Sequence, residues 1–261
     1  MDNQIVFLDK SNEVATIYIN RSEKRNALSY EMWLKISELV EQCRVDPDIK
    51  VVIFRGVDRT AFSAGADISE FKTLRYSAEG ADKYNRATLE AEKAIKQLTK
   101  PTIAMVQGYC VGGGCEISIA CDFRFSDTNG RFGITPAKLG LVYNLPGTKN
   151  LMDLVGPAKT KDILYTGRLL EADEALSIGL IDRVYGPDDI EDKTYEYAYM
   201  ICRNAQFAVR GSKVVINKAL EGEVEDTDEI ADLVLDSFET DDYKEGVKSF
   251  LEKRKPNFQY S

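Results

Sequence analysis

Short apolar segments alternate with amphipathic ones in the first half of the chain, and this alternation constrains the fold more than any other feature. Residues 51–54 and 102–106 are runs of strand length, rich in valine and isoleucine, as expected for strands buried on both faces of a sheet. Residues 31–43 carry apolar side chains at helical spacing, and 78–98 form a longer helical pattern that stops at Lys100-Pro101. Strands buried on both faces need helices on both sides, so the sequence predicts an α/β fold.

The remaining elements divide the chain into two parts. Further strands are expected at residues 5–8, 14–19 and 122–126. From about residue 157 onward the pattern is helical, with helices expected at 158–165, 172–178, 190–204, 207–220, 227–238 and 241–253. No linker rich in proline, glycine or serine separates the two parts. We therefore expect a core with the ligand site at 1–190, and a helical C-terminal region at 191–261 that completes the site and an oligomer interface.

Composition and charge exclude several classes of partner. The 261 residues are 44% hydrophobic and 30% charged, close to the average for a soluble globular protein, and no run of about 18 apolar residues predicts a membrane span. Residues 1–4 lack the features of a secretory signal, so a cytoplasmic location is expected. The net charge of −9 disfavours nucleic acid and anionic membranes as partners, but a local cation could still hold an anionic small ligand.

Histidine is absent from the chain, and this restricts the possible chemistry. Ser-His-Asp and Cys-His mechanisms and histidine-ligated metal sites are excluded, so acid–base catalysis would fall to carboxylates, tyrosines, lysines or water. The cysteines show no CxxC spacing, so neither a structural zinc site nor a disulfide framework is expected; they are Cys43, Cys110, Cys115, Cys121 and Cys202. No metal site is predicted.

Two glycine-bearing loops follow the two buried strands, at residues 61–68 and 108–116. Ligands of α/β proteins bind where strands end and helices begin. A helix that starts at Gly113 or Gly114 would present unpaired N–H groups, which suit an oxygen that becomes negative during a reaction. Neither loop has the spacing of a phosphate-binding loop. By composition alone, such a glycine run is more often a structural turn than a site.

Several motifs together resemble the crotonase (enoyl-CoA hydratase/isomerase) family. They occur in the order and approximate spacing of the family, over roughly residues 4–258, at residues 26–28, 62–68, 100–104, 112–116, 121–122, 156–158, 165–168, 172–181 and 250–258. The resemblance implies a crotonase fold of stacked ββα units with a C-terminal helical region, assembled as a homotrimer or homohexamer. It also implies an acyl-CoA thioester as the ligand, with coenzyme A as part of the substrate and no further cofactor.

The resemblance assigns roles to individual residues. The backbone N–H groups of Ala66 and Gly113 should form an oxyanion hole for the thioester oxygen. Lys24, Arg25 and Ala27 should lie beside the CoA chain, and Ala64, Asp67 and Ile68 should line the adenine pocket. The remaining predicted binding residues are Gly112, Thr135 and Pro136 in the same chain, together with Phe250 and Lys253, which should reach the CoA of a neighbouring subunit.

The resemblance also points to two carboxylates, of which this chain has one. Glu116 matches the first of the two glutamates that flank a water in hydratases of the family; alternatively, it only complements the dipole of its helix. The second glutamate normally lies in an F-x-x-P-E-x-x-L-G run. The ungapped match places Pro136 at that position, and no acidic residue occurs between Arg131 and Lys149.

Residues 135–145 and the tail at 242–258 resemble bacterial methylmalonyl-CoA decarboxylases, in which the tyrosine matching Tyr143 lies at the reacting end of the acyl group. Loss of CO₂ from such a thioester generates the enolate directly, so no base is needed. A second protein carboxylate would repel the carboxylate of the substrate. Decarboxylation of a 2-carboxyacyl-CoA such as methylmalonyl-CoA is therefore the first expectation. The alternatives are a hydratase/isomerase of short-chain enoyl-CoA with Glu116 as its single catalytic glutamate, and a non-catalytic CoA-binding subunit. Tyr143 could also serve only to pack the acyl pocket.

Overall fold

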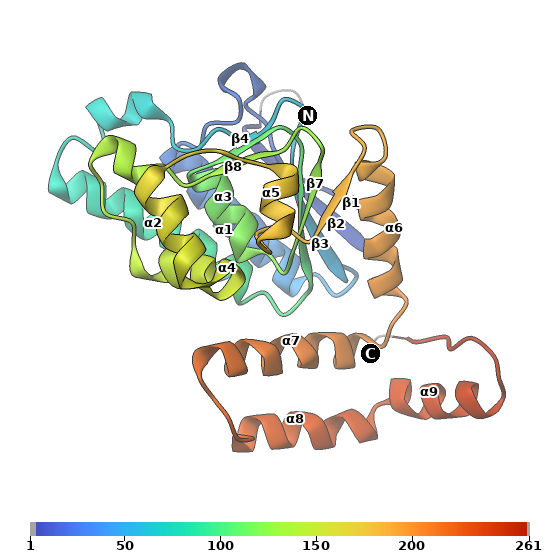
Figure 1. Ribbon diagram of the computed structural model, residues 1–261. Coiled ribbons are helices and arrows are strands. Elements are labelled where there is room, and N and C mark those ends of the chain that lie inside the picture. The colour runs from blue at the N-terminus through green and yellow to red at the C-terminus, as the bar shows by residue number, and fades with distance from the viewer. Residues whose placement is uncertain (1–3, 260–261) are drawn as a thin grey trace.

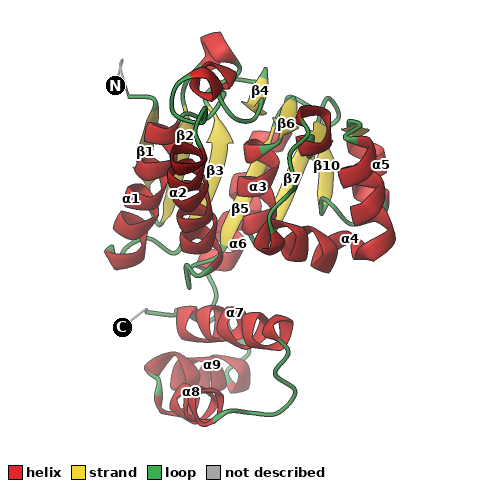
Figure 2. Ribbon diagram, turned by 90° about the vertical axis from the view of Figure 1, so that its left-hand side faces the viewer, coloured by secondary structure: helices red, strands yellow, loops and turns green. Residues whose placement is uncertain are grey.

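The computed structural model describes residues 4–259, and within them the strands form two sheets (Figure 2). The larger sheet has the strand order β1-β2-β3-β5-β7-β10 and the smaller has the order β4-β6-β8-β9. Their bounds are β1 Val6–Ser11, β2 Val14–Ile19, β3 Val51–Gly56, β4 Ala61–Ser63, β5 Thr102–Val106, β6 Tyr109–Val111, β7 Phe123–Asp127, β8 Arg131–Gly133, β9 Leu170–Glu171 and β10 Arg183–Tyr185. Residues 1–3 and 260–261, which belong to the predicted N-terminal segment and C-terminal region, lie outside the described residues.

A repeated strand–strand–helix unit builds the body of the molecule. The pairs β1–β2, β3–β4, β5–β6 and β7–β8 are followed in turn by α1 (Tyr30–Val45), α2 (Ala78–Lys96), α3 (Gly113–Ala120) and α4 (Leu145–Thr166). From the second unit onward, the first strand joins the large sheet and the second strand joins the small sheet. This arrangement is the α/β fold of stacked ββα units that the sequence predicts.

The large sheet is buried on both faces because alternate side chains enter different clusters. Val52 and Phe54 of β3 join the cluster under α1 and α2, while Val51 and Ile53 join a second cluster with α6 (Ile190–Cys202). Side chains of a strand alternate between the two faces, so an uninterrupted apolar run is what a doubly covered strand requires. The bounds predicted for β2 and β5 agree with the structure.

The last three helices form a layer apart from the α/β body (Figure 1). They are α7 (Gln206–Glu221), α8 (Asp228–Glu239) and α9 (Asp241–Leu251), and the short helix α5 (Ala172–Ser177) precedes α6 in the body. Because α6 packs on the large sheet, this helical layer begins only at α7. The predicted boundary between core and C-terminal region, after residue 190, stays a prediction. Within residues 4–259, no helix has the length and apolarity needed to span a bilayer.

The structure differs from the sequence prediction at α4. This helix begins at Leu145, upstream of the predicted start at Ala158. Asn144 accepts a hydrogen bond from the Gly147 N–H at 2.7 Å, and Pro146 lies in the first turn, where its missing N–H has no cost. A kink at Gly156, with φ of 74°, interrupts the helix. Residues that are typical of turns therefore cap and bend one helix here.

Candidate active site

Two glycine loops lie side by side at one edge of the small sheet. Strands β4 and β6 are parallel neighbours, with Ser63 opposite Cys110, so the loops that follow them emerge together. Gly65 and Gly112 have φ of 101° and 50°. This backbone conformation is strained for residues with a side chain and open to glycine. A Cβ built on Gly112 would lie 3.6 Å from the Cα of Gly65, so the two loops are in contact. Ala66 and Gly113, the next residues of each loop, are thereby brought together.

The N–H groups of Ala66 and Gly113 have no protein acceptor in the described part of the chain. A β-bridge joins Ala66 to Leu28 through the residues on either side of Ala66: the Leu28 N–H donates to Gly65 O at 2.7 Å, and the Asp67 N–H donates to Leu28 O at 2.8 Å. The Ala66 N–H takes no part in this bridge. Gly113 is the first residue of α3, where an N–H has no intrahelical partner. Two N–H donors without an acceptor among the described residues therefore lie on neighbouring loops.

Both donors lie in the wall of one cavity of about 460 Å³. The cavity is bounded by the ends of β4, β6 and β8, by α2 and by the segment before α4. Nine of the predicted site residues line it, namely Ala64, Ala66, Ile68, Gly112, Gly113, Glu116, Thr135, Pro136 and Tyr143. The volume is that of a typical small-molecule site. The structure thus gathers these residues in one place, while their individual roles stay predictions.

Glu116 and Tyr143 form the titratable part of this cavity. Glu116 lies in the first turn of α3 and keeps part of its surface open to the cavity. Burial raises the pKa of Glu116 to about 7, although the Tyr143 hydroxyl and the Arg75 cation act in the opposite direction. The Tyr143 oxygen is enclosed without a partner in hydrogen-bond geometry among residues 4–259. Burial and then the Glu116 charge raise the pKa of Tyr143 well above its ordinary value, so the phenol stays neutral.

A family model described as enoyl-CoA hydratase/isomerase matches residues 9–261. The chain belongs to this family. It is 37% identical over 254 residues to a crotonyl-CoA hydratase of Syntrophomonas wolfei, covering 97% of each chain. It is 34% identical over 256 residues to a short-chain-enoyl-CoA hydratase of Clostridium acetobutylicum, covering 98% of this chain and 97% of the relative.

The solved structures agree with the family assignment. An enoyl-CoA hydratase/carnithine racemase from Magnetospirillum magneticum superposes with a TM-score of 0.95 at 35% identity, covering 100% of this chain and 97% of the other. The crotonase fold is therefore shown. The two named relatives are hydratases, so the comparisons favour the hydratase alternative; the decarboxylase subtype and reaction that the sequence pointed to first are not supported by them.

Six predicted CoA-contacting residues lie outside the cavity wall, and four of them form one set, namely Lys24, Arg25, Ala27 and Asp67. Asp67 of this set stabilises a loop. The Asp67 carboxylate accepts hydrogen bonds from Arg21 at 2.6 Å, Lys24 at 3.2 Å and the Ser69 N–H at 2.9 Å. Burial acts to raise the pKa of Asp67, but the hydrogen bonds from Ser69, Arg21 and Lys24 outweigh it and hold that pKa well below its usual range. The Asp67 side chain therefore ties the loop after β4 to the segment that carries Lys24.

The other two residues of this set belong to the same segment. Arg25 has φ of 50° and its guanidinium lies over the Tyr109 ring, 5.5 Å from the centroid. Its carbonyl oxygen accepts a hydrogen bond from the Ala64 N–H at 2.9 Å. The Ala27 carbonyl accepts one from Arg21 at 3.2 Å. The backbone of this segment therefore runs directly beside the loop that leads to Ala66.

Phe250 and Lys253 lie away from the cavity of their own chain. Phe250 is near the end of α9, with 83% of its surface exposed, and Lys253 follows the helix with φ of 54°. Both belong to the separate helical layer (Figure 1). Their predicted contact with a neighbouring subunit is compatible with this position and stays a prediction.

The sequence analysis missed a buried acid behind Glu116. Glu92 of α2 is 4% exposed, and its Oε1 has no hydrogen-bond partner in the described residues. Burial, and then the charge of Glu116, raise the pKa of Glu92 to about 9. A signal existed, because Glu92 falls on the buried face of α2 with Tyr84, Thr88 and Ile95.

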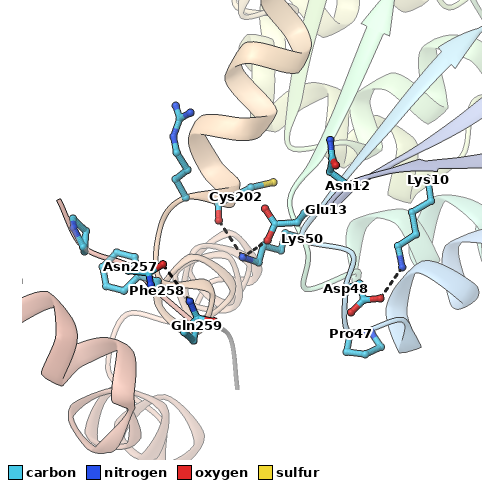
Figure 3. A pocket seen from close by; sticks show the side chains of 12 residues that line it. Lys10, Asn12, Glu13, Pro47, Asp48, Lys50, Cys202, Asn257, Phe258 and Gln259 are labelled. Carbon is cyan, nitrogen blue, oxygen red and sulfur yellow. Dashed lines mark hydrogen bonds and ion pairs between the residues drawn. The ribbon is translucent and has the colours of Figure 1, made fainter.

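A second, larger pocket contains none of the predicted residues. It has a volume of about 800 Å³ and lies between the body and the C-terminal segment that carries Asn257 (Figure 3). Two of the three cations in its wall are already paired: Lys50 lies 2.5 Å from Glu13, and Lys10 lies 3.1 Å from Asp48. The third is Arg203. Because the wall contains no residue that the family motifs assign to the site, the cavity beside Glu116 is the better candidate.

Proposed function

We propose that this chain hydrates a short-chain 2-enoyl-CoA. The observation that carries the proposal is the pair of unpartnered amides of Ala66 and Gly113 in the wall of a cavity that also contains Glu116. The names of the two hydratase relatives support the choice of reaction and of chain length.

The two amides would stabilise the charge that develops on the thioester oxygen. When water adds to C3 of the enoyl group, electrons move onto this oxygen and form an enolate. Donors that are already oriented need no reorganisation, and one such donor contributes about 3–4 kcal/mol to lowering the barrier. The N–H groups of Ala66 and Gly113 are held by a bridge and by a helix start, so both are oriented before substrate arrives.

Glu116 would perform both proton transfers. Its ionised form accepts a proton from water as the water oxygen bonds to C3, and the resulting acid gives this proton to C2 when the thioester carbonyl re-forms. One O–H bond and one carbon–carbon π bond break, and one C–O and one C–H bond form. Because burial raises the pKa of Glu116 to about 7, both protonation states are accessible near neutral pH.

The test is to incubate the protein with crotonyl-CoA and to follow a product heavier by the mass of water. We expect turnover by the wild type, and a loss in kcat of about 10²–10⁴-fold in Glu116→Gln with retained binding of the ester. Binding of CoA esters without any turnover by the wild type would contradict the proposal and favour the non-catalytic subunit.

Decarboxylation is a second candidate because of the segment before α4. This segment has no acidic residue where the family expects a second glutamate, and it places the Tyr143 phenol beside Glu116 instead. Incubation with methylmalonyl-CoA separates the two reactions, since decarboxylation gives a propionyl thioester. If this reaction occurs, Tyr143→Phe should slow it, whereas hydration should depend on Glu116.

A further inference from the structure

A cation that forms no ion pair with the described residues lies in the wall of the candidate active site. Arg75 lines the cavity and is half-buried. Its Cζ lies 4.3 Å from the centroid of the Phe71 ring and 4.5 Å from that of Tyr84. Within residues 4–259 its side chain forms no ion pair. The guanidinium is thus held between two rings and partly withdrawn from water.

A short series of contacts connects Arg75 to the oxyanion donors. A Cβ built on Gly113 would lie 2.8 Å from the Trp33 ring. The Trp33 Nε1–H donates to the Tyr84 hydroxyl at 3.0 Å, and this hydroxyl donates to Leu28 O at 3.1 Å. Tyr84 is therefore fixed, and Arg75 lies against its ring. The charge of Arg75 also acts on Glu116, and both residues line the same cavity.

Two acids near Arg75 in the chain, Glu70 and Asp82, are engaged elsewhere. The Glu70 carboxylate accepts a hydrogen bond from the Tyr30 N–H at 2.9 Å. Asp82, which also lines the cavity, is paired with Arg86 at 2.8 Å. Aromatic faces offset part of the cost of withdrawing a cation from water, but an anion offsets much more of it. The cavity therefore offers a prepared site for a negative group.

We propose that Arg75 binds a carboxylate on the acyl group, so that the substrate is the CoA thioester of a carboxy-substituted 2-enoic acid. The planar guanidinium matches a carboxylate with two parallel hydrogen bonds, which an apolar acyl chain cannot form. Burial keeps Glu116 partly neutral near pH 7, and this limits its repulsion of such a substrate. The inference rests on the proposed hydration and names its substrate class.

The experiment compares two esters of the same length. These are 4-carboxybut-2-enoyl-CoA and pent-2-enoyl-CoA, in which a methyl group replaces the carboxylate. We expect the wild type to prefer the carboxylated ester in kcat/KM by at least about tenfold, as for a hydrogen bond to a charged group. Arg75→Gln should abolish this preference, so that the two esters have equal kcat/KM, and Arg75→Lys should restore part of the preference. Lys93→Gln, which changes an exposed cation on α2 that does not line the cavity, is the matched control and should change neither value.

Binding separates this inference from the proposed reaction. Glutaryl-CoA and pentanoyl-CoA are the saturated counterparts, and calorimetry measures their affinities without turnover. Tighter binding of glutaryl-CoA that depends on Arg75 would support the carboxylate site even if no ester is hydrated. Equal affinities in the wild type would overturn the inference while leaving hydration intact. A loss of affinity in Arg75→Gln that is equal for both esters and for free CoA would also overturn it, because the arginine would then contact the CoA phosphates.

Discussion

At the scale of single residues, burial determines how the acids of this site behave. Glu116 and Glu92 come from different helices, and both have raised pKa values because protein atoms replace their water. The sequence identified Glu116 through its motif. It could not identify Glu92 or Arg75 as part of the site, because their roles depend on which groups the fold brings next to them. The absence of histidine from the sequence leaves carboxylates among the candidates for acid–base chemistry.

The pH dependence of stability tests the burial of Glu92. Because the folded state raises the pKa of Glu92 from 4.5 to about 9, it holds a proton that the unfolded chain releases. The resulting stabilisation is fully present below about pH 4.5 and is lost as the pH rises to about 9. Relative to Glu92→Gln, the wild type should lose up to about 1.4 kcal/mol of unfolding free energy per pH unit in this window. Urea unfolding over a pH series measures this difference. Glu90→Gln, at an exposed position of the same helix, should run parallel to the wild type; a parallel curve for Glu92→Gln would contradict the account.

The pH dependence of activity tests Glu116. If its carboxylate accepts the proton of water, kcat/KM for the preferred ester should fall as the pH decreases through about 7. An ordinary exposed glutamate would instead give a midpoint near 4.3. A profile that is flat between pH 5 and pH 8 would exclude Glu116 as the base.

At the scale of elements, the long helices and buried strands were predictable and the short strands were not. Strands β2 and β5 have the predicted bounds because their apolar runs are as long as the strands. Strands β4, β6 and β8 have three residues each, too few to show a period, and they exist only through pairing with each other. These strands position both glycine loops. The motifs therefore pointed to Ala66 and Gly113 without revealing the sheet that holds their loops.

A methyl group at Gly113 tests the start of α3. The Cβ of Gly113→Ala would lie 2.8 Å from the Trp33 ring, so the helix start must move. We expect a loss of about 1–3 kcal/mol in stability, as for other overpacked sites, together with a lower kcat. Gly211→Ala is the control, because its Cβ would meet Leu233 at an ordinary 3.5 Å inside α7. That variant should be unchanged or slightly more stable. Thermal unfolding of both variants makes the comparison, and equal stability of Gly113→Ala and the wild type would contradict this packing.

At the scale of the whole molecule, the helical layer suggests assembly. Helices α8 and α9 expose apolar side chains that a lone chain leaves in water, among them Leu235, Phe238, Phe250 and Leu251. Large exposed apolar surfaces usually mark interfaces. This agrees with the homotrimer or homohexamer expected from the family resemblance, which stays a prediction.

Light scattering and kinetics test the predicted assembly together. We expect a trimer or hexamer in solution, and dissociation in Phe238→Glu, which places a charge in the apolar face. If Lys253 reaches the CoA of a neighbouring subunit, Lys253→Ala should raise KM several-fold and leave kcat nearly unchanged. A monomeric wild type, or an unchanged KM in Lys253→Ala, would refute the shared site.

The most direct test of binding by the amides of Ala66 and Gly113 is a crystal structure with acetoacetyl-CoA. Its thioester resembles the reacting group but does not add water. If these two amides bind the thioester, its oxygen should lie about 2.7–3.1 Å from the backbone nitrogens of both Ala66 and Gly113. Glu116 should then lie beside the acyl carbons. A thioester bound outside this cavity, or either nitrogen donating to a protein acceptor instead, would contradict it.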